Sequence, residues 1–249
     1  MRSVTVPAVG KRPPEMVVAL PRVVISNGTL EALKWIGLVL MALDHANKYV
    51  FAHTLPGAFE LGRLAMPIFG FVLAYNLARP GALAAGVHTR TMKRLALYGV
   101  AATPFFIGLG GLLSGWWPLN IMFTLLVAAC ILYLVEKGGF ARLAGATALF
   151  LFGGAMVEFW WFALAFVVAA WWYFKTANKL AAAVCALALA ALFVVNKNLW
   201  ALAAVPLMLA APLVDLNIPR LRHVFYAFYP AHLAVLLAVT VLLGTHLSG

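Results

Sequence analysis

The sequence predicts an all-α, polytopic integral membrane helical bundle with about nine transmembrane helices, and two observations carry this prediction. First, 65% of the 249 residues are apolar and 10% are charged, whereas about a quarter of the residues of a soluble domain are charged. Second, the apolar residues form continuous runs close to the roughly 20 residues that a membrane-spanning helix needs. Short loops join these runs, so the chain leaves no room for a soluble catalytic domain.

The predicted spans follow the apolar runs between charged residues, prolines and glycines. We expect Thr29 to cap the first helix, with Glu31 in its first turn, where the positive helix end favours an anion. Residues 1–29, with several prolines, form a predicted cytoplasmic tail, and residues 30–249 form one transmembrane domain. The expected spans are residues 33–52, 62–79, 94–113, 118–135, 141–157, 159–174, 179–195, 199–214 and 223–244.

The placement of Lys and Arg predicts the orientation. With a cytoplasmic N-terminus, only Lys48, Arg63 and Lys197 fall in outer segments, an asymmetry that follows the positive-inside rule. We therefore expect a multi-pass protein of the cell inner membrane. The same rule accounts for most of the net charge of +11, so we expect the lipid bilayer and no nucleic acid as a partner. The inner set is Arg2, Lys11, Arg12, Arg22, Lys34, Arg79, Arg90, Lys93, Arg94, Lys137, Arg142, Lys175, Lys179, Arg220 and Arg222.

An acid and a histidine stand side by side in "LMALDHANKYV", residues 40–50, within the first span. At the helical rise per residue, Asp44 and His45 lie about 17 Å beyond Leu33, past the middle of the bilayer. Ionisable groups at this depth commonly mark a functional site. The alternative is structural: Asp44 pairs with Lys48 or Arg63, and His45 is a core residue with satisfied hydrogen bonds. The residues alone leave both interpretations open.

The segment "FELGRLAMP" brings Glu60 and Arg63 to the outer end of the second span. In an antiparallel hairpin these residues reach the level of the Asp44-His45 pair. Arg63 could then bind Asp44 and leave the imidazole of His45 free to titrate near neutrality.

The last span contains "FYAFYPAHLAVL", in which Tyr226, Tyr229 and His232 surround Pro230. Tyr229 and His232 are three residues apart and share a helix face. The alternative to a functional role is an interfacial aromatic anchor beside a packing kink.

Asn120 and Thr124, in "PLNIMFTL", are four residues apart on one face of the fourth span. Polar side chains on this face would have no hydrogen-bond partners in lipid. This pattern indicates either interhelical hydrogen bonds or donors for a site inside the bundle.

The inner segment "HTRTMKRL" places His88, Arg90, Lys93 and Arg94 within two helical turns, just after Arg79. Such a cluster suits an anion with several phosphates. Membrane orientation explains the same charges equally well.

Four segments in this order resemble the TraX family of conjugative-pilus membrane proteins, typified by the F-pilin acetylase. They are "LKWIGLVLMALDHANKY", "GRLAMPIFGFVLAYNLAR", "NIMFTLL" and "FYAFYPAHLAVL", and the resemblance runs from about residue 30 to 240. TraX proteins are in turn similar to the acyltransferase-3 membrane acetyltransferases. That group has a basic residue and a histidine in its first span at the spacing of Lys34 and His45. Its Arg-x-x-Arg motif is replaced here by Arg90-Thr-Met-Lys93.

The resemblance implies an acetyl-CoA-dependent N-acetyltransferase that acts on the N-terminal amine of a pilin subunit. On this interpretation Lys34, Arg90, Lys93 and Arg94 bind acetyl-CoA as co-substrate, and no metal takes part. His45 is the general base, which suits an imidazole near neutral pH. Asp44 and Arg63 orient the site, and Tyr229, Asn120 or Thr124 donates to the oxyanion. The expected substrate-binding residues are Glu60, Tyr226, His232 and Thr124.

Other functions remain open from the sequence. The same groups could serve a hydroxyl acceptor on a sugar, or another amide-forming step on pilin such as cyclisation. A proton-coupled transporter would show an inverted repeat, which we do not find. A non-catalytic pilus-assembly protein would tolerate substitution of His45. The sequence does not indicate the oligomeric state.

Overall fold

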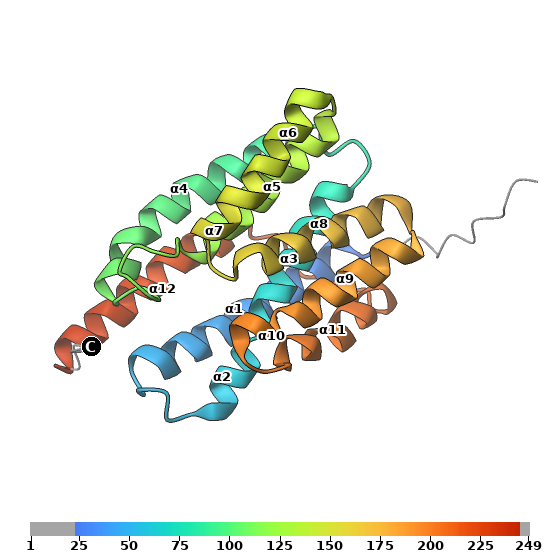
Figure 1. Ribbon diagram of the computed structural model, residues 1–249. Helices are drawn as coiled ribbons and strands as arrows, with labels where there is room; N and C mark the ends of the chain where they lie inside the picture. The colour runs from blue at the N-terminus through green and yellow to red at the C-terminus, as the bar shows by residue number, and fades with distance from the viewer. Residues whose placement is uncertain (1–22, 245–249) are drawn as a thin grey trace, which may run out of the picture.

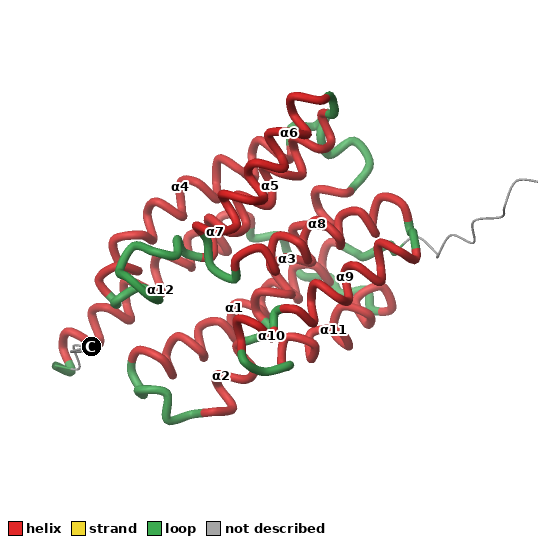
Figure 2. Tube along the Cα trace, viewed as in Figure 1, coloured by secondary structure: helices red, strands yellow, loops and turns green. Residues whose placement is uncertain are grey.

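The structure is a computed structural model that describes residues 23–244. Within this range the chain forms helices and turns and no β-strand (Figures 1 and 2). The helices are α1 (Asn27–Tyr49), α2 (Pro56–Gly62), α3 (Ala65–Ala78), α4 (Val87–Gly108), α5 (Ile121–Lys137), α6 (Phe140–Ala148), η1 (Leu149–Gly153), α7 (Gly154–Met156), α8 (Trp160–Thr176), α9 (Lys179–Ala191), α10 (Phe193–Asn196), η2 (Trp200–Ala203), α11 (Ala204–Ala210), η3 (Ala211–Leu213) and α12 (Arg222–Leu242).

Six helices form a closed ring in which each one packs against the next. The order around the ring is α1, α3, α8, α5, α4 and α12, and α12 returns to α1. Four further helices lie against single members of the ring: α2 against α1, α6 against α5, α9 against α8, and α11 against α3 (Figure 1). The first and last described helices are therefore neighbours, so side chains from both can contribute to one site.

The first helix begins earlier than expected. Ser26 is the N-cap of α1, and its Oγ accepts a hydrogen bond from the amide of Thr29 at 3.2 Å. The predicted cap, Thr29, was wrong because its hydroxyl instead donates to the carbonyl of Val214 at 2.6 Å. Glu31 lies one turn further along and binds Lys34 Nζ at 2.6 Å.

Part of the expected N-terminal tail belongs to the folded body. Ile25 is 3% exposed, and its amide donates to the hydroxyl of Tyr75 at 2.8 Å. Gly28 fits closely against the backbone near Leu216, where a Cβ would lie 1.6 Å from the Leu216 oxygen. The folded body therefore includes residues 23–29, and the remainder of the expected tail lies outside the described residues.

The outer surface of the helices is strongly apolar. Side chains such as Phe140 (89% exposed) and Leu187 (71% exposed) face outward along with many other large hydrophobic residues. Exposed apolar area on this scale indicates contact with lipid or protein rather than water. Three described segments are long and apolar enough to cross a membrane: Pro56–Ala78, Lys179–Asn196 and His223–Leu242.

Each expected span overlaps a helical segment, although several segments are not single α-helices. The expected span 141–157 is divided into α6, η1 and α7, and the span 199–214 into η2, α11 and η3. The break expected between the spans 141–157 and 159–174 is confirmed, because residues 157–159 separate α7 from α8. Helix α4 begins at Val87 rather than near residue 94, so part of the basic segment is helical. The number of membrane crossings stays a prediction.

Candidate functional site

Two cavities lie within the helical ring and share part of their walls. The first, which we call the basic cavity, has a volume of about 240 Å³. The second, the histidine cavity, has a volume of about 450 Å³. Met41, Phe69 and Ile121 line both, so the cavities adjoin at these three side chains. The polar residues of the basic cavity include Lys34, Asn76, Arg90, Arg94, Arg220 and Tyr226. Those of the histidine cavity include Asp44, His45, Lys48, Arg63 and Glu158.

His45 on α1 and His232 on α12 form a hydrogen-bonded pair. His45 Nδ1 lies 2.7 Å from His232 Nε2, and His232 Nδ1 lies 3.0 Å from the carbonyl oxygen of Phe228. A carbonyl oxygen only accepts, so His232 carries its proton on Nδ1 and its Nε2 accepts from His45 Nδ1–H. In the neutral pair, Nε2 of His45 is therefore unprotonated. The arrangement leaves His45 with a free basic nitrogen at the wall of the histidine cavity.

Asp44, the neighbour of His45, forms the ion pair that the sequence suggested. Arg63 Nη2 donates to the Asp44 carboxylate, and Arg63 Nε donates to the carbonyl of Phe59 at 3.2 Å. The guanidinium also lies over the Phe59 ring, 4.3 Å from its centroid. Gly62 permits this contact, because a Cβ there would lie 2.3 Å from Asp44 Cβ. The pair thus fixes α2 against α1 beside His45.

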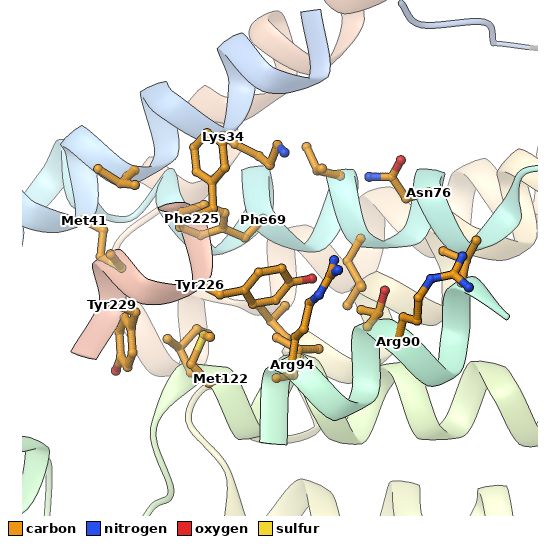
Figure 3. Close-up of a pocket in the computed structure, with 18 of the residues that line it drawn as sticks. Lys34, Met41, Phe69, Asn76, Arg90, Arg94, Met122, Phe225, Tyr226 and Tyr229 are labelled. Carbon is orange, nitrogen blue, oxygen red and sulfur yellow. The ribbon is translucent and has the colours of Figure 1, made fainter. Parts of the chain in front are cut away.

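The basic cavity gathers positive charge from several parts of the chain. Lys34 comes from α1, Arg90 and Arg94 from α4, and Arg220 from the segment before α12. Figure 3 shows Arg94 beside the hydroxyl of Tyr226, with Arg90 further along the same helix. Since Arg90 and Arg94 are four residues apart, they lie on the same side of α4. The spacing of the cationic groups suits a ligand with more than one anionic group.

Two other residues of the predicted basic cluster point elsewhere. Lys93 is exposed and lines neither cavity. His88 is buried, with Nε2 lying 3.3 Å from a carboxylate oxygen of Glu136, which also binds Lys175. Burial lowers the pKa of His88, which favours the neutral imidazole. Neither side chain belongs to the cavity wall.

Asn120 and Thr124, predicted to take part in catalysis and substrate binding, make hydrogen bonds between the helices and lie outside both cavities. The side chain of Asn120 caps α5 by accepting from the amide of Met122 at 3.1 Å, and its amino group donates to the carbonyl of Gly99 at 3.2 Å. Thr124 Oγ1 donates to the carbonyl of Glu158 at 2.9 Å. Both are buried and line neither cavity. Their polar atoms hold α5 to its neighbours.

The remaining predicted residues lie in the basic cavity or on α2. Tyr226 and Tyr229 line the basic cavity, and the Tyr229 ring centroid lies 6.5 Å from that of His45. Figure 3 shows the Tyr229 ring turned away from Tyr226, at the end of the cavity away from Arg90. Glu60 lies on α2 and lines neither cavity.

Sequence reasoning missed two polar residues of this region, Arg220 and Glu158. Arg220 lines the basic cavity, where its Nε lies 3.8 Å from Glu31. Glu158 is 8% exposed and lines the histidine cavity. A carboxylate at the boundary between two apolar runs was the only available signal for Glu158, and it resembled an ordinary loop residue.

Apolar outer faces, a closed helical ring and internal cavities lined by ionisable groups define a helical protein of membrane type with a polar site between its helices. Its segments belong to a known group: the chain is a member of the TraX family, since the family model described as "TraX protein" matches residues 29–240.

Two curated relatives agree with this assignment. Protein TraX of Escherichia coli is 34% identical over 131 residues, which cover 53% of this chain and 50% of the relative. Protein TraX of Escherichia coli strain K12 is 34% identical over 122 residues, covering 49% and 46%. The chain thus spans about half the length of the curated relatives it matches. No solved structure matches the chain.

Proposed function

We propose that this protein transfers an acetyl group from acetyl-CoA to the N-terminal amine of a conjugative pilin. One observation carries the proposal: the hydrogen bond to His232 leaves a basic nitrogen of His45 free. This nitrogen belongs to the histidine cavity, which adjoins the basic cavity. A base and a polyanion site in adjoining cavities are what transfer from a phosphorylated thioester donor requires. Membership of the TraX family supplies the link to conjugation.

Acetyl-CoA would bind with its phosphates among the cationic groups of the basic cavity. Arg90 and Arg94 offer planar guanidinium groups that can hold phosphate oxygens in pairs, and Lys34 supplies a third charge. The pantetheine arm would then extend toward Met41, Phe69 and Ile121, the residues that the two cavities share. This path leads the thioester toward His45.

In the reaction, His45 Nε2 accepts a proton from the acceptor nitrogen as that nitrogen attacks the thioester carbonyl carbon. The Tyr229 hydroxyl donates a hydrogen bond to the oxyanion that forms. The carbon–sulfur bond then breaks, and the departing sulfur takes the proton from His45. The products are the N-acetylated amine and the free thiol of CoA. The Asp44–Arg63 pair fixes the helix that carries the base.

This proposal includes a membrane topology of about nine crossings with a cytoplasmic N-terminus in the inner membrane. The basic cavity then faces the compartment that contains acetyl-CoA. Its support is the placement of Lys and Arg along the sequence.

The test is intact-mass analysis of a candidate pilin co-expressed with wild-type protein or with His45→Ala. We expect one acetyl group on pilin with wild type and none with the variant, at equal amounts of membrane-inserted protein. Loss of one water from pilin would indicate cyclisation instead. An unmodified pilin with wild type would contradict the proposal.

A further inference from the structure

Glu158 is a buried carboxylate to which the proposed transfer mechanism assigns no role. It lies in the short segment between α7 and α8, it is 8% exposed, and it lines the histidine cavity together with His45. Removing a carboxylate from water is costly unless charges or hydrogen bonds compensate it. A carboxylate in this position therefore needs an explanation.

The backbone around Glu158 is fixed on both sides. The amide of Glu158 donates to the carbonyl of Leu119 at 3.0 Å, and the amide of Leu119 donates to the carbonyl of Met156 at 2.8 Å. The hydroxyl of Thr124 holds the carbonyl of Glu158 at 2.9 Å. These contacts tie the segment to the start of α5, so the position of the carboxylate is set by the fold.

The carboxylate lies at the junction of the two cavities. The segment of Glu158 pairs with Leu119, two residues before Ile121, the first residue of α5. Ile121 lines both cavities, and the Tyr229 ring lies 6.5 Å from that of His45, measured between centroids. Glu158 and His45 thus line the same space, close to the point where the thioester would meet its acceptor.

The nearest cationic side chains are engaged by other groups. Lys48 Nζ donates to the carbonyl of Gly111 at 3.2 Å, and Arg63 binds Asp44. Among the described side chains, no Lys, Arg or His lies within the 4.0 Å of an ion pair with Glu158. Lys48 and Arg63 act on this carboxylate only through their longer-range charge. A bound cationic ligand would supply the direct partner that the described residues do not provide.

We infer that Glu158 binds the ammonium group of the acceptor, so that the acceptor class is a primary amine presented as a cation on an apolar segment. This inference rests on the proposed transfer to an amine. The histidine cavity suits such a ligand, because the Glu158 carboxylate lines it together with an apolar part of the wall that includes Phe159, Trp160 and Val194. Glu158 holds the cation and accepts its first proton, which frees the nitrogen lone pair for attack and later passes to water. His45 removes the second proton as the amide forms and delivers it to the departing sulfur. A hydroxyl acceptor would leave the carboxylate without its partner.

The first experiment measures acetylation of a peptide with a free N-terminal amine and an otherwise apolar sequence. In Glu158→Gln, which keeps the size and removes the charge, the KM for the peptide should rise at least tenfold while the affinity for acetyl-CoA is unchanged. The matched control is Asp215→Asn, since Asp215 is exposed and lines neither cavity. An unchanged peptide KM in Glu158→Gln would overturn the inference and leave the proposed transfer intact.

The second experiment needs no variant and no reaction. Binding to the wild-type protein without acetyl-CoA is compared for two forms of the peptide, one with an N,N-dimethylated terminal amine and one with a hydroxyl in its place. The first is cationic and cannot form the amide, whereas the second is neutral. We expect the cationic form to bind at least tenfold more tightly, and equal affinities would overturn the inference. Tight binding of the cation without any acetyl transfer in the first experiment would support the cation site and contradict the proposed function.

Discussion

His45 Nδ1 donates to His232 Nε2 across 2.7 Å, and the two imidazole rings are nearly parallel, with an interplanar angle of 8°. The second histidine is itself oriented by the carbonyl of Phe228. This chain of hydrogen bonds assigns one role to each ring. His45 presents a free nitrogen to the cavity, and His232 acts as a positioning residue that determines which nitrogen of His45 is free.

His232→Ala removes the acceptor for His45 Nδ1 and allows the wrong tautomer of His45 to form. We expect kcat for acetyl transfer to fall about tenfold or more. This loss should be smaller than the 10²–10⁴-fold loss expected for His45→Ala. The KM for acetyl-CoA should not change, because the basic cavity is untouched. Steady-state kinetics of purified protein in detergent would measure both constants.

A conservative variant separates positioning from packing. In His232→Gln the side-chain oxygen can still accept from His45 Nδ1, so part of the lost kcat should return. If His232→Gln and His232→Ala have equal kcat values, the hydrogen bond does not position the base.

Variants of the Asp44–Arg63 ion pair can separate its effect on stability from its effect on transfer activity. Its side chains are 13% and 16% exposed, so Arg63→Leu leaves a largely buried carboxylate without its partner. We expect a loss of about 3 kcal/mol in the free energy of unfolding, and a smaller loss in the double variant Asp44→Leu/Arg63→Leu, in which no charge is stranded. Thermal unfolding in detergent would measure both, with Arg142→Ala as the exposed control.

The same double variant distinguishes the two interpretations of the pair. If the pair only holds α2 to α1, the double variant should recover transfer activity along with stability. If the pair also orients the site, stability should return while kcat stays low, which is the outcome we expect.

Local sequence patterns predicted much of this fold because continuous apolar runs identify membrane helices in a sequence. Each of the nine expected spans overlaps a helical segment, and the hairpin argument correctly paired Arg63 with Asp44. Helix ends were less predictable. Ser26 and Thr29 are both suitable caps, and the choice depends on the contact of Thr29 with Val214, far along the chain.

The site was only partly predictable because its main contacts join distant parts of the chain. His45 and His232 are 187 residues apart, and their hydrogen bond depends on the packing of α1 against α12. Glu158 looked like a loop residue, and its burial depends on the pairing of its segment with Leu119. The polar stripe of Asn120 and Thr124 was recognised, but the side-chain oxygen of Asn120 accepts as a helix cap and the hydroxyl of Thr124 donates to a loop carbonyl.

Helix α2 contains two glycines, and we expect their replacement by alanine to have opposite effects on stability. A Cβ on Gly62 would lie 2.3 Å from Asp44 Cβ, whereas a Cβ on Gly57 would have no neighbour within 4 Å. Gly62→Ala should therefore cost about 1–3 kcal/mol of stability and disturb the contact of Asp44 with Arg63. Gly57→Ala should be neutral or stabilising by up to about 1 kcal/mol, because alanine favours the helix. The midpoint temperatures of thermal unfolding of the two variants would test this prediction. Equal midpoints would contradict the close approach of α2 to α1.

The last prediction concerns the three basic residues that the sequence grouped together on α4. Arg90 and Arg94 line the basic cavity, whereas Lys93 is exposed and lines neither cavity. Charge-assisted hydrogen bonds are worth about 1.5–3 kcal/mol each. Arg90→Ala and Arg94→Ala should therefore each raise the KM for acetyl-CoA about tenfold or more, while Lys93→Ala should change it less than about twofold.

The KM values for acetyl-CoA of these three variants are most informative when they are measured at several salt concentrations. Exposed charges more than about 10 Å from a ligand are screened at 0.1 M ionic strength, whereas contacts inside a cavity are screened less. Any residual effect of Lys93→Ala should disappear at high salt, and the effects of Arg90→Ala and Arg94→Ala should persist. Equal, salt-sensitive effects of all three variants would mean that the basic segment of α4 attracts anions or membrane lipid as a surface, and that the cavity is not the donor site.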